Sequence, residues 1–282
     1  MYATLISTAD LAAHLADPSF VIVDVRHDLA SPDTWGEDEY RRAHLPGARF
    51  AHVDRDLSAP KSGTNGRHPL PAPETCAALF GRLGIDAAKH VVAYDQGTGM
   101  YAARLWWMLH WLGHDAVALL DGGYAAWARE GRQVMTDLPE VRPATFVARR
   151  AEPVIDAGTV AESLASHSLL LVDSRDRERF RGDVEPMDPV AGHIPGAINR
   201  PYLENLRADG TFKPVHELRA DFDVLVTGRA GAAVVHYCGS GVSACHNVLA
   251  MERAGLGGAR LYPGSWSEWC ADRTRPVARG DA

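Results

Sequence analysis

The chain carries the same series of short motifs twice. Val-Ile-Val-Asp-Val-Arg at 21–26 matches Leu-Leu-Val-Asp-Ser-Arg at 170–175, and a His-x-Pro-Gly-Ala motif starts at His44 and, at the same spacing, at His193. The apolar runs 91–95 and 234–238 match next, and a Leu…Gly…Trp pattern follows them in both halves. Four landmarks in one order predict a duplicated domain. The 282 residues are enough for two domains of ordinary size.

Within each copy, short β-branched runs alternate with longer amphipathic segments. Helix-like segments lie at 8–15, 77–83, 102–112 and 124–130 in the first copy and at 156–165 and 244–254 in the second. This alternation predicts an α/β fold in which helices flank a mainly parallel sheet. Prolines interrupt a stretch without helical period, so we expect domains at 1–138 and 153–282 with a linker at 139–152. In such sheets the chemistry lies at the carboxyl ends of strands, where Asp95 and Cys238 stand.

The composition narrows the class of protein. With 29 Lys and Arg against 36 Asp and Glu, the net charge of −7 gives no basic bias toward nucleic acid or an anionic membrane. The apolar stretch 105–112 is too short to cross a bilayer, and residues 1–20 do not resemble a secretory signal. Four scattered cysteines without a Cys-x-x-Cys pair predict free thiols in a cytoplasmic protein, with no metal.

The loop after Cys238 distinguishes this residue from the other three cysteines. Cys76, Cys245 and Cys270 stand among apolar residues and are expected to be core residues. After Cys238, the glycines at 239 and 241 let successive N–H groups turn inward as an anion-binding nest, and a helix beginning near Ser243 adds its positive end. This arrangement favours the nucleophilic thiolate. We therefore predict that Cys238 is a catalytic nucleophile.

The chain resembles the rhodanese superfamily, specifically its two-domain sulfurtransferases. The motifs that carry the resemblance are Asp95-Gln96-Gly97, the 103–109 segment, Leu120-Asp121-Gly122-Gly123, Arg179-Phe180-Arg181-Gly182, the 192–197 segment and Cys238-Gly239-Ser240-Gly241-Val242-Ser243-Ala244. The resemblance implies tandem duplicated rhodanese-like domains, of which only the second is catalytic. Asp95 stands where the first domain would carry the cysteine, and a carboxylate cannot take up a sulfane sulfur.

The resemblance also implies the reaction. Such enzymes take sulfur from a small anionic donor, hold it as a cysteine persulfide without a cofactor, and pass it to cyanide, a thiol or thioredoxin. The loop is close to that of 3-mercaptopyruvate enzymes, with Ser243 in place of threonine. Ser240 stands where mammalian thiosulfate enzymes carry a basic residue.

Further residue roles come from the resemblance. Arg179 is implied as the donor-binding arginine. The cradle of the sulfur is expected from the loop itself, from the backbone of Gly239, Gly241, Val242 and Ser243. Mercaptopyruvate enzymes often have a second arginine where this chain has Met187, so thiosulfate stays open as donor; Arg181 is a candidate replacement.

A proton relay is implied as well. Ser240 and His44 match two of its members, and Asp33 is a candidate for the acid. The recurrence of His-x-Pro-Gly at His193 offers a second interpretation of His44, as a residue that locks a turn in each copy. Arg67 and His68, in a turn-rich loop, are further candidates for contact with the substrate.

Three alternatives remain at this point. A cysteine phosphatase would need an arginine at the end of the loop, but the first arginine after Cys238 is Arg253. A non-catalytic binding module would not need the intact Cys238 loop. A sulfur-delivery protein for cofactor or tRNA thiolation would share the persulfide and differ only in its acceptor.

Overall fold

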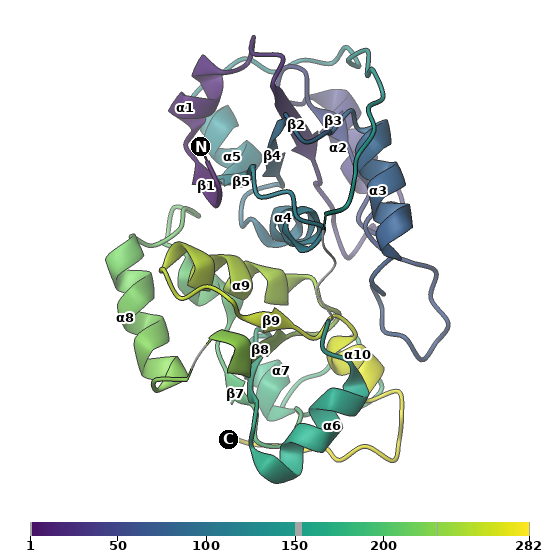
Figure 1. The fold of residues 1–282 in the computed structure, drawn as a ribbon, viewed down its shortest axis with the longest axis vertical. Coiled ribbons are helices and arrows are strands. Elements are labelled where there is room, and N and C mark those ends of the chain that lie inside the picture. The colour runs from purple at the N-terminus through teal and green to yellow at the C-terminus, as the bar shows by residue number, and fades with distance from the viewer. Residues whose placement is uncertain (1, 150–153, 230, 282) are drawn as a thin grey trace. The chain divides into compact units, whose positions relative to one another are not determined.

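The computed structural model describes residues 2–149, 154–229 and 231–281, which form two compact units (Figure 1). Unit 1 contains the described residues of 1–59, 71–152 and 208–212, and unit 2 those of 60–70, 153–207 and 213–282. Two short segments therefore fold with the unit formed by the other repeat. They are 60–70, inside the first repeat, and 208–212, inside the second.

The described part of the expected linker, residues 139–149, is hydrogen-bonded to unit 1 and does not run free between the two units. The Ala144 N–H donates to the carbonyl oxygen of Gly81 at 2.9 Å, and the Arg149 N–H donates to that of Leu112 at 3.0 Å. These bonds attach the chain to unit 1 up to residue 149. Residues 150–152, and residue 153 at the start of the expected second domain, lie outside the described part.

Unit 1 is built on a five-stranded parallel sheet. Its strands are β1 (Leu5–Ile6), β2 (Phe20–Asp24), β3 (Arg49–Phe50), β4 (His90–Tyr94) and β5 (Val117–Leu120), in the spatial order β1-β5-β4-β2-β3. Its helices are α1 (Thr8–Ala13), α2 (Trp35–Arg42), α3 (Pro73–Arg82), α4 (Met100–Trp111) and α5 (Gly123–Arg129). The central strands β2 and β4 are buried on both faces, as their continuous apolar runs predict.

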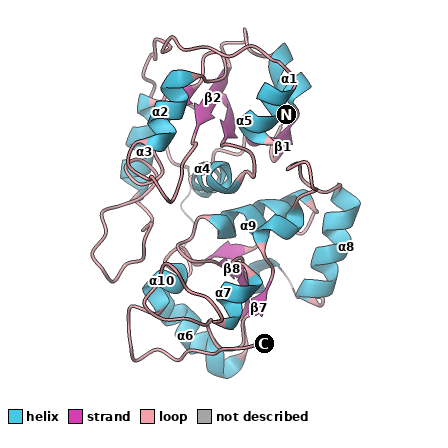
Figure 2. Ribbon diagram, turned by 180° about the vertical axis from the view of Figure 1, so that it is seen from behind, coloured by secondary structure: helices cyan, strands magenta, loops and turns pink. Residues whose placement is uncertain are grey.

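Unit 2 repeats this plan with four strands. They are β6 (Leu170–Asp173), β7 (Ile198–Asn199), β8 (Val234–Tyr237) and β9 (Arg260–Leu261), all parallel and ordered β7-β6-β8-β9. The helices are α6 (Ala157–Ser166), α7 (Arg177–Arg181), α8 (Val215–Val226), α9 (Ser243–Arg253) and α10 (Ser265–Trp269), with 3₁₀ turns η1 (Tyr202–Asn205) and η2 (Gly231–Ala233). Figure 2 shows helices on both sides of the strands in each unit. The predicted α/β fold is confirmed.

A buried ion pair stands at the same place in both units. The Arg26 guanidinium binds the Asp24 carboxylate at 2.7 Å, and Arg175 binds Asp173 at 2.6 Å; all four side chains are almost fully buried. Each aspartate is the last residue of a central strand, so the pair ties the carboxyl end of the sheet to the loop that comes next. Loss of one partner would leave a buried charge uncompensated.

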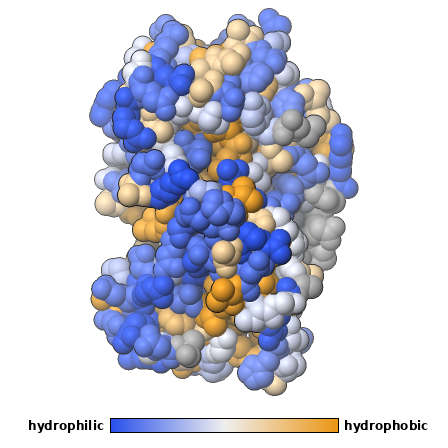
Figure 3. All heavy atoms as spheres, turned by 90° about the vertical axis from the view of Figure 1, so that its left-hand side faces the viewer, coloured by the Kyte–Doolittle hydropathy of each residue, from blue (hydrophilic) through white to orange (hydrophobic). Residues whose placement is uncertain are grey.

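The surface is mixed in character. On the face shown in Figure 3, hydrophilic side chains cover most of the area and apolar ones occur in small groups. Among the described residues, no helix combines the length and the apolar character that crossing a bilayer requires.

Candidate active site

Cys238 lies at the carboxyl end of β8, directly before the loop that leads into α9. Its side chain is buried, and its Sγ accepts the N–H of Gly241 at 3.2 Å. Gly241 has a φ of +77°, and a Cβ there would lie 2.9 Å from the carbonyl carbon of Pro263 and closer still to its oxygen. No other residue fits this position without moving the backbone. The loop thus aims an N–H group at the sulfur.

The start of α10 holds the loop in place. Trp266 and Ser267 donate their N–H groups to the carbonyl oxygens of Cys238 and Gly239, both at 2.9 Å. The Cys238 N–H donates in turn to the Ser265 hydroxyl at 3.1 Å. Because three hydrogen bonds fix the backbone at 238 and 239, the position of the thiol depends little on solvent or on the surface.

The matching loop of unit 1 already holds an anionic group. The carboxylate of Asp95, the counterpart of Cys238, accepts the N–H groups of Gly97, Gly99 and Tyr101, each at 2.9 Å. Burial raises the pKa of Asp95, while these backbone donors oppose that shift. In both units, therefore, backbone N–H donation from the loop reaches the side chain that begins it, from three residues to Asp95 and from Gly241 to Cys238.

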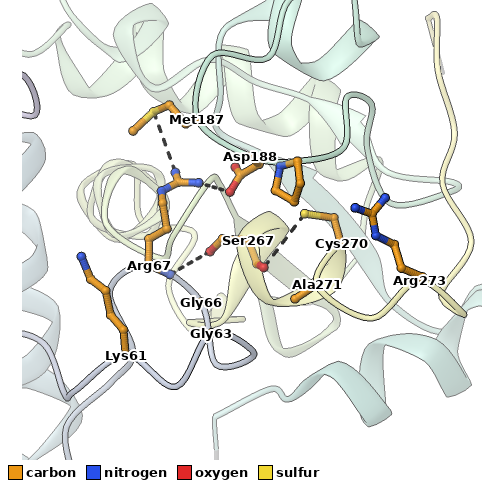
Figure 4. A pocket seen from close by; sticks show the side chains of 11 residues that line it. Lys61, Gly63, Gly66, Arg67, Met187, Asp188, Ser267, Cys270, Ala271 and Arg273 are labelled. Carbon is orange, nitrogen blue, oxygen red and sulfur yellow. Dashed lines mark hydrogen bonds and ion pairs between the residues drawn. The ribbon is translucent and has the colours of Figure 1, made fainter.

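Two guanidinium groups meet beside the loop that follows Cys238. Arg179, on α7, places its two terminal nitrogens 3.4 and 3.5 Å from the point where a Cβ on Gly239 would stand, and Nη2 of Arg67 lies 2.6 Å from it. Both arginines pair with the buried carboxylate of Asp188: Arg67 with Oδ1, and Arg179 with Oδ2 at 3.3 Å. Figure 4 shows the Arg67 guanidinium next to Asp188 and the Met187 sulfur. Glycine at 239 leaves room for two cations next to Cys238.

A second buried carboxylate orients Arg179. Glu185 accepts from Arg179 at 2.8 Å and from Arg175 at 3.2 Å, and Arg175 is itself bound to Asp173. The chain of ion pairs runs from the end of β6 to the loop that follows Cys238. Since the carboxylates are buried, the guanidinium of Arg179 is held in one orientation.

Ser240 has a histidine partner within unit 2. Nδ1 of His68 lies 2.7 Å from the Ser240 hydroxyl, and both side chains are buried. The pair stands two residues beyond Cys238 and is capable of passing a proton. Sequence reasoning named both residues but did not join them.

The His44 side chain occupies a different setting, inside unit 1. Its Nδ1 lies 2.7 Å from the carbonyl oxygen of Tyr40, and its ring stacks on the Tyr40 ring at 4.3 Å between centroids. His193 repeats this in unit 2, with Nδ1 2.8 Å from the carbonyl oxygen of Phe180 and a stacking distance of 3.8 Å. The same contacts in both units support the interpretation of His44 as a turn-locking residue.

Three other arginines have settings of their own. Arg181 is half exposed and pairs with Asp183 and Asp281, so it does not join Arg179 at the loop. Arg104 is fully buried and donates to the carbonyl oxygen of Leu57 at 3.4 Å. Arg253 ends α9, about 15 Å from the loop that follows Cys238 by the helix rise, so it does not provide the arginine of a cysteine phosphatase.

The sequence did not reveal the residues that assemble the site from a distance. Asp188 and Glu185 lie in a proline-containing loop, where acidic residues are normally solvated, and Ser265 and Ser267 lie in the motif after β9. No periodicity marks any of them. Only their burial next to arginine or backbone donors gives them a role.

These features define the class. The rhodanese-like domain model matches residues 7–130 and 156–272, one match in each repeat. The chain belongs to the rhodanese family and consists of two rhodanese-like domains.

Relatives narrow the activity. A Pseudomonas aeruginosa protein named as a probable 3-mercaptopyruvate sulfurtransferase is 47% identical over 282 residues, covering 99% of each chain. The 3-mercaptopyruvate sulfurtransferase of Escherichia coli is 34% identical and covers 95% of each. A Mycobacterium tuberculosis relative, 42% identical over 99% of this chain and 98% of its own, is provisionally named a thiosulfate sulfurtransferase. A solved 3-mercaptopyruvate sulfurtransferase from Leishmania major superposes with a TM-score of 0.85 at 31% identity, over 97% of this chain and 76% of that one. The chain is a sulfurtransferase.

Proposed function

We propose that this enzyme carries sulfane sulfur as a persulfide on Cys238, with 3-mercaptopyruvate as its preferred donor and thiosulfate as the alternative. The observation that carries the proposal is the pair of matching loops: one begins with a carboxylate that backbone N–H groups bind, the other with a buried thiol.

The Asp95 side chain resembles the proposed Cys238 persulfide in length and negative charge. Its Oδ atoms are separated from Cα by the same number of bonds as the outer sulfur of a cysteine persulfide. In unit 1, Oδ1 of Asp95 accepts the N–H groups of Gly97 and Gly99, whose counterparts by position are Ser240 and Val242. We therefore assign the N–H groups of Ser240 and Val242 to the negative outer sulfur.

The first half-reaction moves sulfur and leaves a stable product. The Cys238 thiolate attacks the sulfur of 3-mercaptopyruvate, and the carbon–sulfur bond breaks with its electron pair going to carbon. The proton of the donor thiol passes to that carbon, so that pyruvate leaves and the persulfide anion remains. With thiosulfate the sulfur–sulfur bond breaks, sulfite leaves, and no proton moves. Arg179 holds the anionic end of either donor.

The pair of Ser240 and His68 favours mercaptopyruvate. Only this donor requires a proton transfer, and a hydroxyl with a histidine at 2.7 Å is suited to it. A serine at position 240 also adds no cation for the thiosulfate dianion. We assign the relay to His68 rather than His44.

The second half-reaction returns the enzyme to its thiolate. Cyanide, a small thiol or a thioredoxin thiolate attacks the outer sulfur, the sulfur–sulfur bond breaks, and the electron pair stays on Cys238. The four cysteines are all free thiols, which suits a reducing compartment. We propose a cytoplasmic location on this ground.

The test is direct sulfur loading. The protein is incubated with each donor in the absence of acceptor, and its intact mass is compared with that of Cys238→Ser and of Cys270→Ser. Burial raises the pKa of Cys270 to about 11, so it stays a thiol at neutral pH and serves as the matched control. We expect one added sulfur in the wild type and in Cys270→Ser, none in Cys238→Ser, and removal by cyanide. Equal loading of Cys238→Ser, or no loading by either donor, would refute the proposal.

A further inference from the structure

We propose that Arg67 is the second donor-binding cation of this site. It would come from the 60–70 segment in place of a basic residue at position 187. The inference rests on the proposed function and names a specificity-determining residue for it.

The first observation is convergence. The guanidinium groups of Arg67 and Arg179 both reach the space above Gly239, the residue after Cys238. Nη2 of Arg67 stands 2.6 Å from the Cβ position of Gly239, nearer than either terminal nitrogen of Arg179. Any side chain at 239 would displace Arg67. An anion held against this point would therefore meet both arginines.

The second observation concerns unused donors. Nη1 of Arg67 binds Asp188, whereas the one hydrogen-bond acceptor of Nη2 among the described residues is the Met187 thioether sulfur, at 3.9 Å. Thioether sulfur is a weak acceptor. Nε of Arg67 is buried and has no hydrogen-bond acceptor within 2–149, 154–229 and 231–281. The N–H groups of Nε and Nη2 thus lack a strong acceptor, and together they match two parallel oxygens of a carboxylate or sulfonate.

The third observation is that the protein holds Arg67 in place. The Asp188 carboxylate accepts from Arg67 with one oxygen and from Arg179 with the other, which lets two like charges stand side by side. The Arg67 N–H donates to the Ser267 hydroxyl at 3.0 Å, and Ser267 also binds the backbone of Gly239. Arg67 is thereby anchored, through side chain and backbone, to the loop that carries Cys238.

The surroundings provide access. Arg67 forms part of the wall of a cavity of about 370 Å³ in unit 2 (Figure 4). The other residues that line it are Lys61, Gly63, Gly66, Met187, Asp188, Pro189, Ser267, Cys270, Ala271 and Arg273. One side chain therefore touches both a cavity with further cations and the catalytic loop. The ligand chemistry that fits is the oxyanion group of a small donor.

The experiment measures steady-state kinetics with both donors for Arg67→Ala. We expect its donor KM to rise about ten- to a hundredfold, the loss typical of one charge-assisted interaction, with a much smaller change in kcat. Arg181→Ala is the matched control, because Arg181 also lies in unit 2 but is half exposed and pairs with Asp183 and Asp281 instead of reaching the Cys238 loop. It should keep the wild-type KM. The donor whose KM rises more is the one whose oxyanion Arg67 binds.

A rescue variant separates donor binding from simple damage. Met187 contacts Arg67, so an arginine introduced at 187 can bring its guanidinium to the same place. We expect Met187→Arg in the Arg67→Ala background to lower the donor KM again. If Arg67→Ala does not fold, Arg67→Lys decides: it keeps the charge facing Asp188 but loses the fork, and its KM should also rise.

The outcomes are distinct. A KM of Arg67→Ala within about twofold of the wild type for both donors, or a loss confined to kcat, would overturn the inference while sulfur loading of Cys238 stands. If the wild type takes up no sulfur from either donor, the proposed function itself fails.

Discussion

The substitution Gly241→Ala tests whether the loop backbone controls the chemistry of Cys238. Gly241 combines a φ of +77° with a close approach to Pro263. Gly196 supplies a control in the same unit: its φ is +75°, but nothing lies within 4 Å of its Cβ position. Both alanine variants carry the cost of left-handed backbone, and only one of them adds steric overlap.

The magnitudes come from this difference. Left-handed backbone costs an alanine about 1–2 kcal/mol, which is the full expectation for Gly196→Ala. A Cβ on Gly241 also lies 2.9 Å from both Cα and the carbonyl carbon of Pro263, so backbone must move, and overpacking of this kind costs about 1–3 kcal/mol more. The same movement withdraws the Gly241 N–H from Sγ of Cys238. It also displaces the N–H groups of Ser240 and Val242 on either side of Gly241, which we assign to the outer sulfur. Losing one such preorganised donor to developing negative charge lowers the rate by about 10²–10³-fold.

Two assays decide the matter. Urea unfolding compares the free energies of the two variants, and steady-state sulfur transfer from 3-mercaptopyruvate compares their kcat. We expect Gly241→Ala to unfold at lower urea than Gly196→Ala and to lose most of its activity, while Gly196→Ala stays active. The reasoning fails if both variants have the same unfolding free energy and Gly241→Ala keeps the wild-type kcat.

Three further changes have defined outcomes. His68→Asn should lower kcat with 3-mercaptopyruvate by about 10²–10⁴-fold and kcat with thiosulfate far less, because only the first donor requires a proton transfer. The control His44→Asn should change kcat alike for both donors. The reverse pattern would show that His44, and not His68, is the relay histidine. Burial lowers the pKa of His236 to about 3 from 6.5, so the folded state disfavours its protonation. The contribution of neutral His236 to the free energy of unfolding is therefore fully present above about pH 6.5 and falls by about 1.4 kcal/mol per pH unit as the pH drops toward 3. Between pH 7 and pH 5 the urea midpoint should fall less for His236→Gln than for the wild type. Arg175→Met should destabilise the protein by about 3–5 kcal/mol in the same assay, since it leaves Asp173 uncompensated; an unchanged midpoint would contradict this.

Much of the fold could be predicted from local pattern. The central strands β2, β4, β6 and β8 lie within one or two residues of their expected positions, because buried parallel strands are continuous apolar runs. α2 was not predicted, because its sequence is mostly polar and shows no apolar period; only Gly36 and Tyr40 in it are buried. α8 did carry a signal, with Leu218, Phe222 and Val226 buried at a spacing of four residues. The two-residue strands at the sheet edges are too short to show any period.

The sequence by itself determined which half we propose as catalytic. The duplication, the glycine-containing loop and the exchange of cysteine for Asp95 can all be read directly from the order of the residues, and together they distinguish Cys238 from the other cysteines. The loop works through its own backbone, so its neighbours in sequence are also its neighbours in space.

Only the tertiary structure decided what surrounds the thiol. Arg67 reaches Asp188 across 121 residues of chain, and His68 reaches Ser240 across 172. Such contacts form because the 60–70 segment folds with unit 2, and no periodicity or motif records that choice. Burial then gives these side chains their effect, since a charge or hydroxyl removed from water acts strongly on the few groups it touches.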